Sequence, residues 1–130
     1  MRIFRSFDVS ASALTAERLR LSVIATNIAN AETTRTPQGG PYRRKEVVFM
    51  PRGDGGVEVA AIREDTTTPP RLVYNPGHPD ANEEGFVAYP NVSVVNEMVD
   101  LLAATRAYEA NVAALNATKS MLTSSLNIGR

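Results

Sequence analysis

The fold is decided by the C-terminal stretch of residues 92–128, which reads VSVVNEMVDLLAATRAYEANVAALNATKSMLTSSLNI. This stretch has no Gly or Pro and is rich in Ala, so its composition favours a helix. Its apolar side chains recur at steps of seven, and a second apolar row follows four residues after some of them: Val94, Leu101, Tyr108, Leu115 and Leu122, then Met98, Val112 and Leu126. The spacing predicts one long helix whose apolar stripe can pair as in a coiled coil.

Both ends of this helix carry expected capping residues. Ser93 stands where a side-chain oxygen can accept a hydrogen bond from the first free backbone N–H groups. Glu97 would lie near the positive end of the helix dipole. Gly129 follows the last apolar residue, where a left-handed glycine commonly ends a helix.

A second helical stripe lies at the N-terminus, over about residues 3–28. Phe7, Leu14, Leu21 and Ile28 recur at steps of seven in a span without Gly or Pro. A lone helix with one apolar stripe is marginal in water. We therefore expect the two terminal helices to pair with each other, within one subunit or between subunits.

The middle of the chain has a different composition. Residues 36–90 hold all eight Pro and seven of the eight Gly, between short β-branched runs. These runs predict strands near residues 46–50, 56–62, 71–74 and 85–89, with a hairpin turn at Gly53–Gly56. The sequence thus predicts a mainly α fold with a small antiparallel β insert. The expected segments are an N-terminal helix (1–34), a β-rich insert (35–92) and a C-terminal helix (93–130).

Charge and composition exclude several kinds of function. Fourteen basic residues balance fourteen acidic ones, which argues against a nucleic-acid partner. The chain has no Cys, so it has no disulfide and no thiol nucleophile. No stretch approaches the roughly 18 consecutive apolar residues of a membrane span. The N-terminal apolar residues are interrupted by polar ones and soon followed by charges: Asp8, Ser10, Ser12 and Thr15, then Glu17, Arg18 and Arg20. We therefore interpret this end as mature helix and not as a cleaved signal peptide.

No motif in the sequence indicates catalysis, a cofactor or a metal. His78 is the single histidine, and it lacks a partnering nucleophile motif. A glycine-rich loop that could hold phosphate at the start of a helix is absent. His78 lies near acidic residues, but one His is a poor ligand set for a transition metal, and a solvated loop is expected. Two weaker alternatives are a small hydrolase using His78 and a binding module that inserts one helix into a partner's groove.

The two ends resemble the flagellar axial proteins, which are the rod, hook and hook-associated proteins of bacteria. The N-terminal resemblance lies in residues 10–34, SASALTAERLRLSVIATNIANAETT, and the C-terminal one in RAYEAN at 106–111 with Met121, Leu122 and Leu126. The middle segments TRTPQGGPYRR (34–44), VYNPGHPDA (73–81) and YPNV (89–92) are similar to those of proximal rod subunits in that family. The resemblance covers nearly the whole chain.

The resemblance implies a structural role in motility. Proteins of this family build the rod that transmits motor torque to the hook and filament, and their termini form a coiled-coil core. It implies assembly with copies of the chain and with homologous rod proteins, including other proximal rod subunits, the distal rod and the adaptor to the MS ring. It also implies export through the flagellar type III apparatus, without a cleaved signal peptide, to a periplasmic rod.

Five polar residues in the two terminal segments leave alternatives open. Asn27 and Asn30 fit a frayed helix end, or they set the register across a helix pair, and the family resemblance favours register. Arg106, Glu109 and Asn111 fit either a solvated face or polar contacts between subunits. The basic run Arg43–Lys45 is expected to be solvated or to touch a neighbouring subunit.

Overall fold

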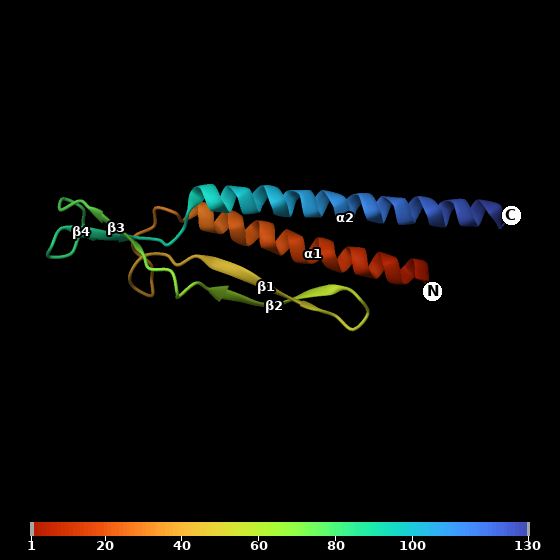
Figure 1. Cartoon of the computed structure of the whole chain (residues 1–130), viewed down its shortest axis with the longest axis horizontal. Coiled ribbons are helices and arrows are strands. Elements are labelled where there is room, and N and C mark those ends of the chain that lie inside the picture. Colours follow the sequence, from red (N-terminus) through yellow and green to blue (C-terminus); the bar gives the residue numbers. More distant parts are fainter. Residues whose placement is uncertain (1, 130) are drawn as a thin grey trace.

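The protein is elongated, with two long antiparallel helices and two β-hairpins (Figure 1). The computed structural model describes residues 2–129. Helix α1 spans Arg2–Ala29 and helix α2 spans Val94–Ile128, and four strands lie between them in the chain. The N- and C-termini lie at the same end of the molecule. This arrangement confirms the predicted mainly α fold with a small β region between terminal helices.

The β region forms two separate two-stranded sheets. Strands β1 (Lys45–Pro51) and β2 (Val57–Glu64) pair antiparallel, with a bulge between Val48 and Phe49. Strands β3 (Arg71–Tyr74) and β4 (Phe86–Tyr89) make a second antiparallel pair. All four predicted strands are present, with bounds that shift by no more than two residues. The β1–β2 hairpin runs along α1, whereas β3–β4 extends beyond the other end of the helices (Figure 1).

Helix α1 lies between two neighbours, and α2 has one. Within residues 2–129, α1 contacts α2 on one side and the β1–β2 hairpin on the other, while α2 contacts no element except α1. The buried residues follow this difference. Helix α1 buries Ala16, Val23, Ile24 and Asn27, and α2 buries Glu97 and Ala104.

The covered face of α2 differs in one row from the predicted stripe. Leu101, Tyr108, Leu115 and Leu122 are half-buried, in line with the steps of seven. A further covered row stands three residues after members of the first: Glu97, Ala104, Asn111 and Thr118. Of the row four residues after, Thr105 and Val112 are half-buried, while Met98 and Leu126 are exposed. Small or polar side chains in the row from Glu97 let the helices approach closely. A search for apolar residues alone does not find such a row. Met98 therefore lies on the uncovered side, with about half of its surface exposed.

The C-terminal end of α2 extends past α1. Helix α2 has 35 residues and α1 has 28, a difference of about 10 Å at 1.5 Å per residue. Leu126 and Ile128 lie in this overhang and are exposed, because α1 has no residues there to cover them.

One of the expected caps is wrong. The Ser93 side chain accepts a hydrogen bond from the backbone N–H of Asn96, as predicted, and Glu97 lies in the first turn. Gly129, however, has φ −72° and ψ 0°, which is right-handed. Its N–H donates to the carbonyl of Ser125, so the glycine continues the last turn and does not reverse the chain.

Candidate functional site: a polar junction and an uncovered helix face

A buried polar cluster joins the end of α1 to the start of α2, and we call it the polar junction (Asn27, Tyr42, Arg44 and Glu97). Asn27 is fully buried on the last turn of α1. Its Nδ2 donates to the carbonyl of Lys45 at 2.8 Å and to Oε2 of Glu97 at 3.2 Å. Its Oδ1 accepts from the Tyr42 hydroxyl at 2.8 Å and from the Lys45 backbone N–H at 3.0 Å. The amide therefore uses both donors and both acceptor positions.

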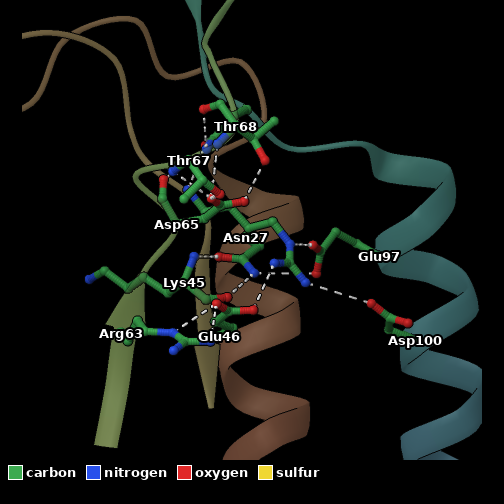
Figure 2. A network of polar contacts seen from close by, with 11 residues as sticks. Asn27, Lys45, Glu46, Arg63, Asp65, Thr67, Thr68, Glu97 and Asp100 are labelled. Carbon is green, nitrogen blue, oxygen red and sulfur yellow. Dashed lines mark hydrogen bonds and ion pairs between the residues drawn. The ribbon is translucent and has the colours of Figure 1, made fainter. Parts of the chain in front are cut away.

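The Glu97 carboxylate balances its burial with two partners from other segments. The residue is 1% exposed, and its Oε1 accepts from Arg44 Nε at 2.5 Å while Oε2 accepts from Asn27. Arg44 also lies 3.4 Å from Glu46 and 3.8 Å from Asp100, so it links β1 to α2 (Figure 2). A buried carboxylate without such a partner would be costly.

The junction also shifts the pKa of two of its members. Burial works to lower the pKa of Arg44, but the hydrogen bonds and negative charges of Glu97 and Glu46 outweigh it and raise the pKa above its ordinary value. Burial raises the pKa of Tyr42, and the nearby charges of Glu97 and Glu64 add to that shift. At neutral pH the junction thus contains a charged Arg44 and a neutral Tyr42 hydroxyl.

The geometry of the junction makes it a structural clamp. It connects residues separated by 15 to 70 positions, from three segments of the chain. Among the described residues, no buried side-chain nitrogen or oxygen lacks a hydrogen-bond partner. A fully satisfied buried network fixes one arrangement of the elements that it joins. We conclude that the junction sets where the β1–β2 hairpin and α2 begin relative to α1.

Two further clamps hold the loops around the junction. Asn91 accepts from the Arg44 N–H at 2.8 Å and donates to the carbonyls of Asp65 and Thr68. The Asp65 carboxylate accepts hydrogen bonds from Thr68 and Thr67, which lower its pKa to about 2 (Figure 2).

The second clamp lies nearer the β3–β4 hairpin. Asp80 accepts from the Thr34 hydroxyl at 2.7 Å and pairs with the Arg35 guanidinium. These two partners, in that order, lower the pKa of Asp80. The clamp ties the loop after α1 to the loop between β3 and β4.

The outer face of α2 carries several exposed large apolar side chains. Near the start of α2, Val95, Met98, Val99 and Leu102 are each more than half exposed. Their spacing of three and four residues places them on one side of the helix. At the other end, Met121, Leu126 and Ile128 are similarly exposed. Large exposed apolar patches of this kind mark interaction surfaces.

Residues 2–129 meet neither the requirements for a metal-ligand cluster nor those for a membrane-spanning helix. Within residues 2–129, no group of three or more His, Cys, Asp and Glu side chains could hold a metal ion. His78 Nδ1 accepts from the Asp80 N–H at 3.0 Å, and its ring lies edge-on to Tyr89. Neither α1 nor α2 has the hydrophobicity over the length needed to cross a membrane.

Comparison with known proteins identifies the family. The family model for "Flagella basal body rod protein" matches residues 7–35, and the model for "Flagellar basal body rod FlgEFG protein C-terminal" matches residues 83–128. The flagellar basal-body rod protein FlgC of Borreliella burgdorferi is 45% identical, with 98% of each chain covered. The FlgC proteins of Bacillus subtilis and Escherichia coli are each 46% identical over the whole of both chains. The chain belongs to the FlgC family of flagellar basal-body rod proteins. It is a structural subunit of the rod and assembles with other rod proteins.

For this FlgC-family chain, the structure places the predicted stripe residues in two environments. Phe7, Leu14, Leu21 and Ile28 of α1 are half-buried, as are Leu101, Tyr108, Val112, Leu115 and Leu122 of α2. Val94, Met98 and Leu126 are exposed in the single chain. The role of all twelve in assembly stays a prediction.

The predicted polar residues differ in whether they make contacts between elements. Asn27 lies in the polar junction and bonds across to α2, whereas Asn30 makes local bonds to the Thr26 carbonyl and the Thr33 hydroxyl. Asn111 donates to the Ala107 carbonyl on its own helix. Arg106 and Glu109 are exposed and form no salt bridge with any described residue.

Three members of the junction were not expected from the sequence to be functional residues. Tyr42 appeared only within a family motif, Arg44 was expected to be solvated or to touch another subunit, and Glu97 was noted only for the helix dipole. Arg44 is instead half-buried against Glu97. The available signal was the acidic Glu97 in the first turn of α2, together with a basic run leading into β1.

Proposed function

We propose that this FlgC-family chain builds the proximal rod by packing its terminal helices against those of neighbouring subunits in a helical tube. The observation that carries the proposal is that α2 contacts a single element and exposes apolar residues along its outer face and its overhang. An apolar helix face in water is stabilised when another apolar surface covers it. The neighbours are copies of the chain and homologous rod proteins: other proximal rod subunits, the distal rod and the adaptor to the MS ring.

The mechanical role follows from the same arrangement. Segments 1–34 and 93–130 supply the coiled-coil core of the tube, and segment 35–92 forms a β-rich insert around it. Torque passes from subunit to subunit through many apolar contacts, and no chemical step is needed. The polar junction supports this role, because it holds α1, β1 and α2 in one fixed arrangement. A stiff subunit transmits rotation with little loss.

The setting of this assembly is part of the proposal. The chain leaves the cytoplasm through the flagellar type III export apparatus, without a cleaved signal peptide, and assembles in the periplasm. The resemblance of its N-terminal motif to axial proteins supports this route. The role is non-enzymatic and needs no cofactor, in keeping with relatives that are named as rod proteins.

The overhang of α2 offers a direct test of the assembly. Leu126→Asp places a charge on a residue that is exposed in the single chain, so the subunit should still fold. In the tube, the same charge would enter an apolar contact and cost several kcal/mol. We expect loss of swimming and loss of the chain from purified basal bodies, with unchanged helicity of the purified subunit by circular dichroism.

Ser124→Asp is the matched control, since it adds the same charge two residues away on an exposed polar position. It should leave swimming intact. Normal swimming and normal basal bodies in Leu126→Asp would contradict the proposal, as would recovery of the wild-type chain only as a cytoplasmic complex of fixed small size.

A further inference from the structure

The β3–β4 hairpin carries an apolar face that its own chain leaves largely uncovered. In the strand register, Tyr74 pairs with Phe86 and Leu72 pairs with Ala88, so these four residues share one face, which we call the hairpin patch. Leu72 and Tyr74 are about two-thirds exposed. The Tyr74 and Phe86 rings meet edge to face at 5.4 Å. Gly85 lies beneath them with φ +87°, and a Cβ there would come within 2.8 Å of the Tyr74 ring.

The opposite face of the hairpin already has its packing. Val87 is fully buried and Val73 is half-buried, which accounts for the attachment of the hairpin to the neighbouring loops. Among the described residues, the β3–β4 pair contacts no other helix or strand. Within residues 2–129, Ala88 borders the loop at 34–41, whereas Leu72 and Tyr74 stay largely uncovered by the chain. The hairpin patch also lies beyond the end of the helices, where it can meet another molecule (Figure 1).

A second uncovered surface lies near the start of α2, and we call it the α2 patch (Val95, Met98, Val99 and Leu102). It is apolar and faces away from α1. The hairpin of the same chain does not contact it. Each copy thus presents two different apolar surfaces, both largely uncovered.

The charges beside the two patches are opposite. Glu83 and Glu84 are exposed just before Phe86, next to the hairpin patch. Arg106 is exposed one turn beyond Leu102, next to the α2 patch, and pairs with no described carboxylate. Glu109 is also exposed on this side, but it lies farther along the helix from the patch. Two hairpin patches that met each other would bring four glutamates together, which is unfavourable. A hairpin patch that meets an α2 patch brings Glu83 and Glu84 towards Arg106.

We propose that the hairpin patch of one copy docks on the α2 patch of a second copy of this chain. The contact joins two different surfaces, so each copy can bind one neighbour by its hairpin and another by its α2. Contacts of this type build rings or open helical assemblies and not a two-fold symmetric dimer, and the helical rod corresponds to the open case. The proposal rests on the rod function and specifies one of the contacts between copies.

The lack of Cys in the chain allows a clean cross-linking test. Leu72→Cys and Val99→Cys are made in two differently tagged copies of the full chain, which are co-expressed and recovered in basal bodies. A disulfide needs Cα atoms within about 7 Å, so it reports direct contact. We expect a cross-linked product that carries both tags. Ile62→Cys on β2, exposed but outside both patches, replaces Leu72→Cys in the control and should give no such product.

Charge exchange provides the second variant. Arg106→Glu should lower the yield of the cross-link by about two- to fivefold, as expected for an exposed ion pair. Combining it with Glu83→Arg and Glu84→Arg in the tagged partner should restore the yield. Loss of both single-Cys variants from basal bodies, with the control retained, would show that both patches lie in an interface. Swimming of the charge-exchange variants without Cys would then decide whether the two patches face each other.

Several outcomes would overturn the docking. One is recovery of all variants in basal bodies without a cross-link between tags. Another is a cross-link from Leu72→Cys to a different rod protein only. A third is failure of the charge exchange to restore yield or swimming. Recovery of the tagged chains in basal bodies reports the rod function separately, so that function would stand even if the docking failed.

Discussion

Helices α1 and α2 share a heptad stripe, yet they differ in how much of their surface the chain covers. Helix α1 has α2 on one side and the β1–β2 hairpin on the other, while α2 has only α1. Accordingly, Val23 and Ile24 of α1 are buried, whereas Val95 and Val99 of α2 are exposed. The difference indicates that the two helices have different structural roles. Helix α1 forms the centre of the single subunit, and we propose that α2 provides the surface for its neighbours.

The interface between the two helices contains buried polar residues at one end. Fully buried Glu97 and Asn27 meet there, and small Ala104 follows one heptad after Glu97. Apolar burial alone would allow the helices to slide by a turn, because a heptad pattern repeats. The polar junction fixes the register, since a shift would leave buried polar groups without partners.

The largest expected effect on stability comes from a charge on the buried face of α1, compared with the same charge on the outer face of α2. Ile24→Asp puts a carboxylate in the buried interior between α1 and its neighbours, so the free energy of unfolding should fall by at least about 3 kcal/mol. Leu102→Asp on the outer face of α2 should change it by less than about 0.5 kcal/mol. Urea unfolding followed by circular dichroism measures both. Similar losses in the free energy of unfolding for the two variants would contradict the proposed difference between the helices.

A smaller but more specific effect is expected for asparagines on the two helices. Asn27→Ala leaves Tyr42, Lys45 and Glu97 short of hydrogen bonds in a buried site, so it should cost about 2–4 kcal/mol. Asn111→Ala removes one local bond and introduces a better helix former, so no loss is expected. Thermal and urea unfolding of the purified variants give the comparison. If Asn27→Ala were as stable as the wild type, the junction would not be what holds α1, β1 and α2 together.

The smallest expected effect is a pH dependence that arises outside the helices. Hydrogen bonds from Thr68 and Thr67 hold the pKa of Asp65 at about 2, below its ordinary 3.8. A carboxyl whose pKa is lowered by folding stabilises the folded state above about pH 4, and this contribution is lost as the pH falls from 4 to 2. Stability should decline over that range, and less steeply in Asp65→Asn. Carbon NMR of the Asp65 carboxyl gives its pKa directly, and an ordinary value would contradict the prediction.

The sequence predicted the elements well because their signals are local. The steps of seven located both helices, and Gly- and Pro-bounded β-branched runs located the four strands. Ser93 was identified as the cap of α2 for the same reason. The covered row of Glu97, Ala104, Asn111 and Thr118 was missed, because a search for large apolar residues favours Met98 and Leu126 over small and polar ones.

The polar junction could not be predicted, because its members are brought together only by the tertiary fold. Asn27 and Glu97 are 70 residues apart, and Tyr42 and Arg44 come from the segment leading into β1. No spacing rule connects such positions. The two hairpins lie in separate sheets for a similar reason, since strand runs alone do not say which strands share a sheet.

The most direct test of the division between the helices is a cryo-EM map of the assembled rod with this chain in place. We predict that Val95, Val99 and Leu102 of α2 are covered by neighbouring subunits in this map, while α1 keeps the same partners within its own chain. A map in which this face of α2 borders solvent, or in which α1 exchanges its contacts with α2 for contacts with another subunit, would contradict the account.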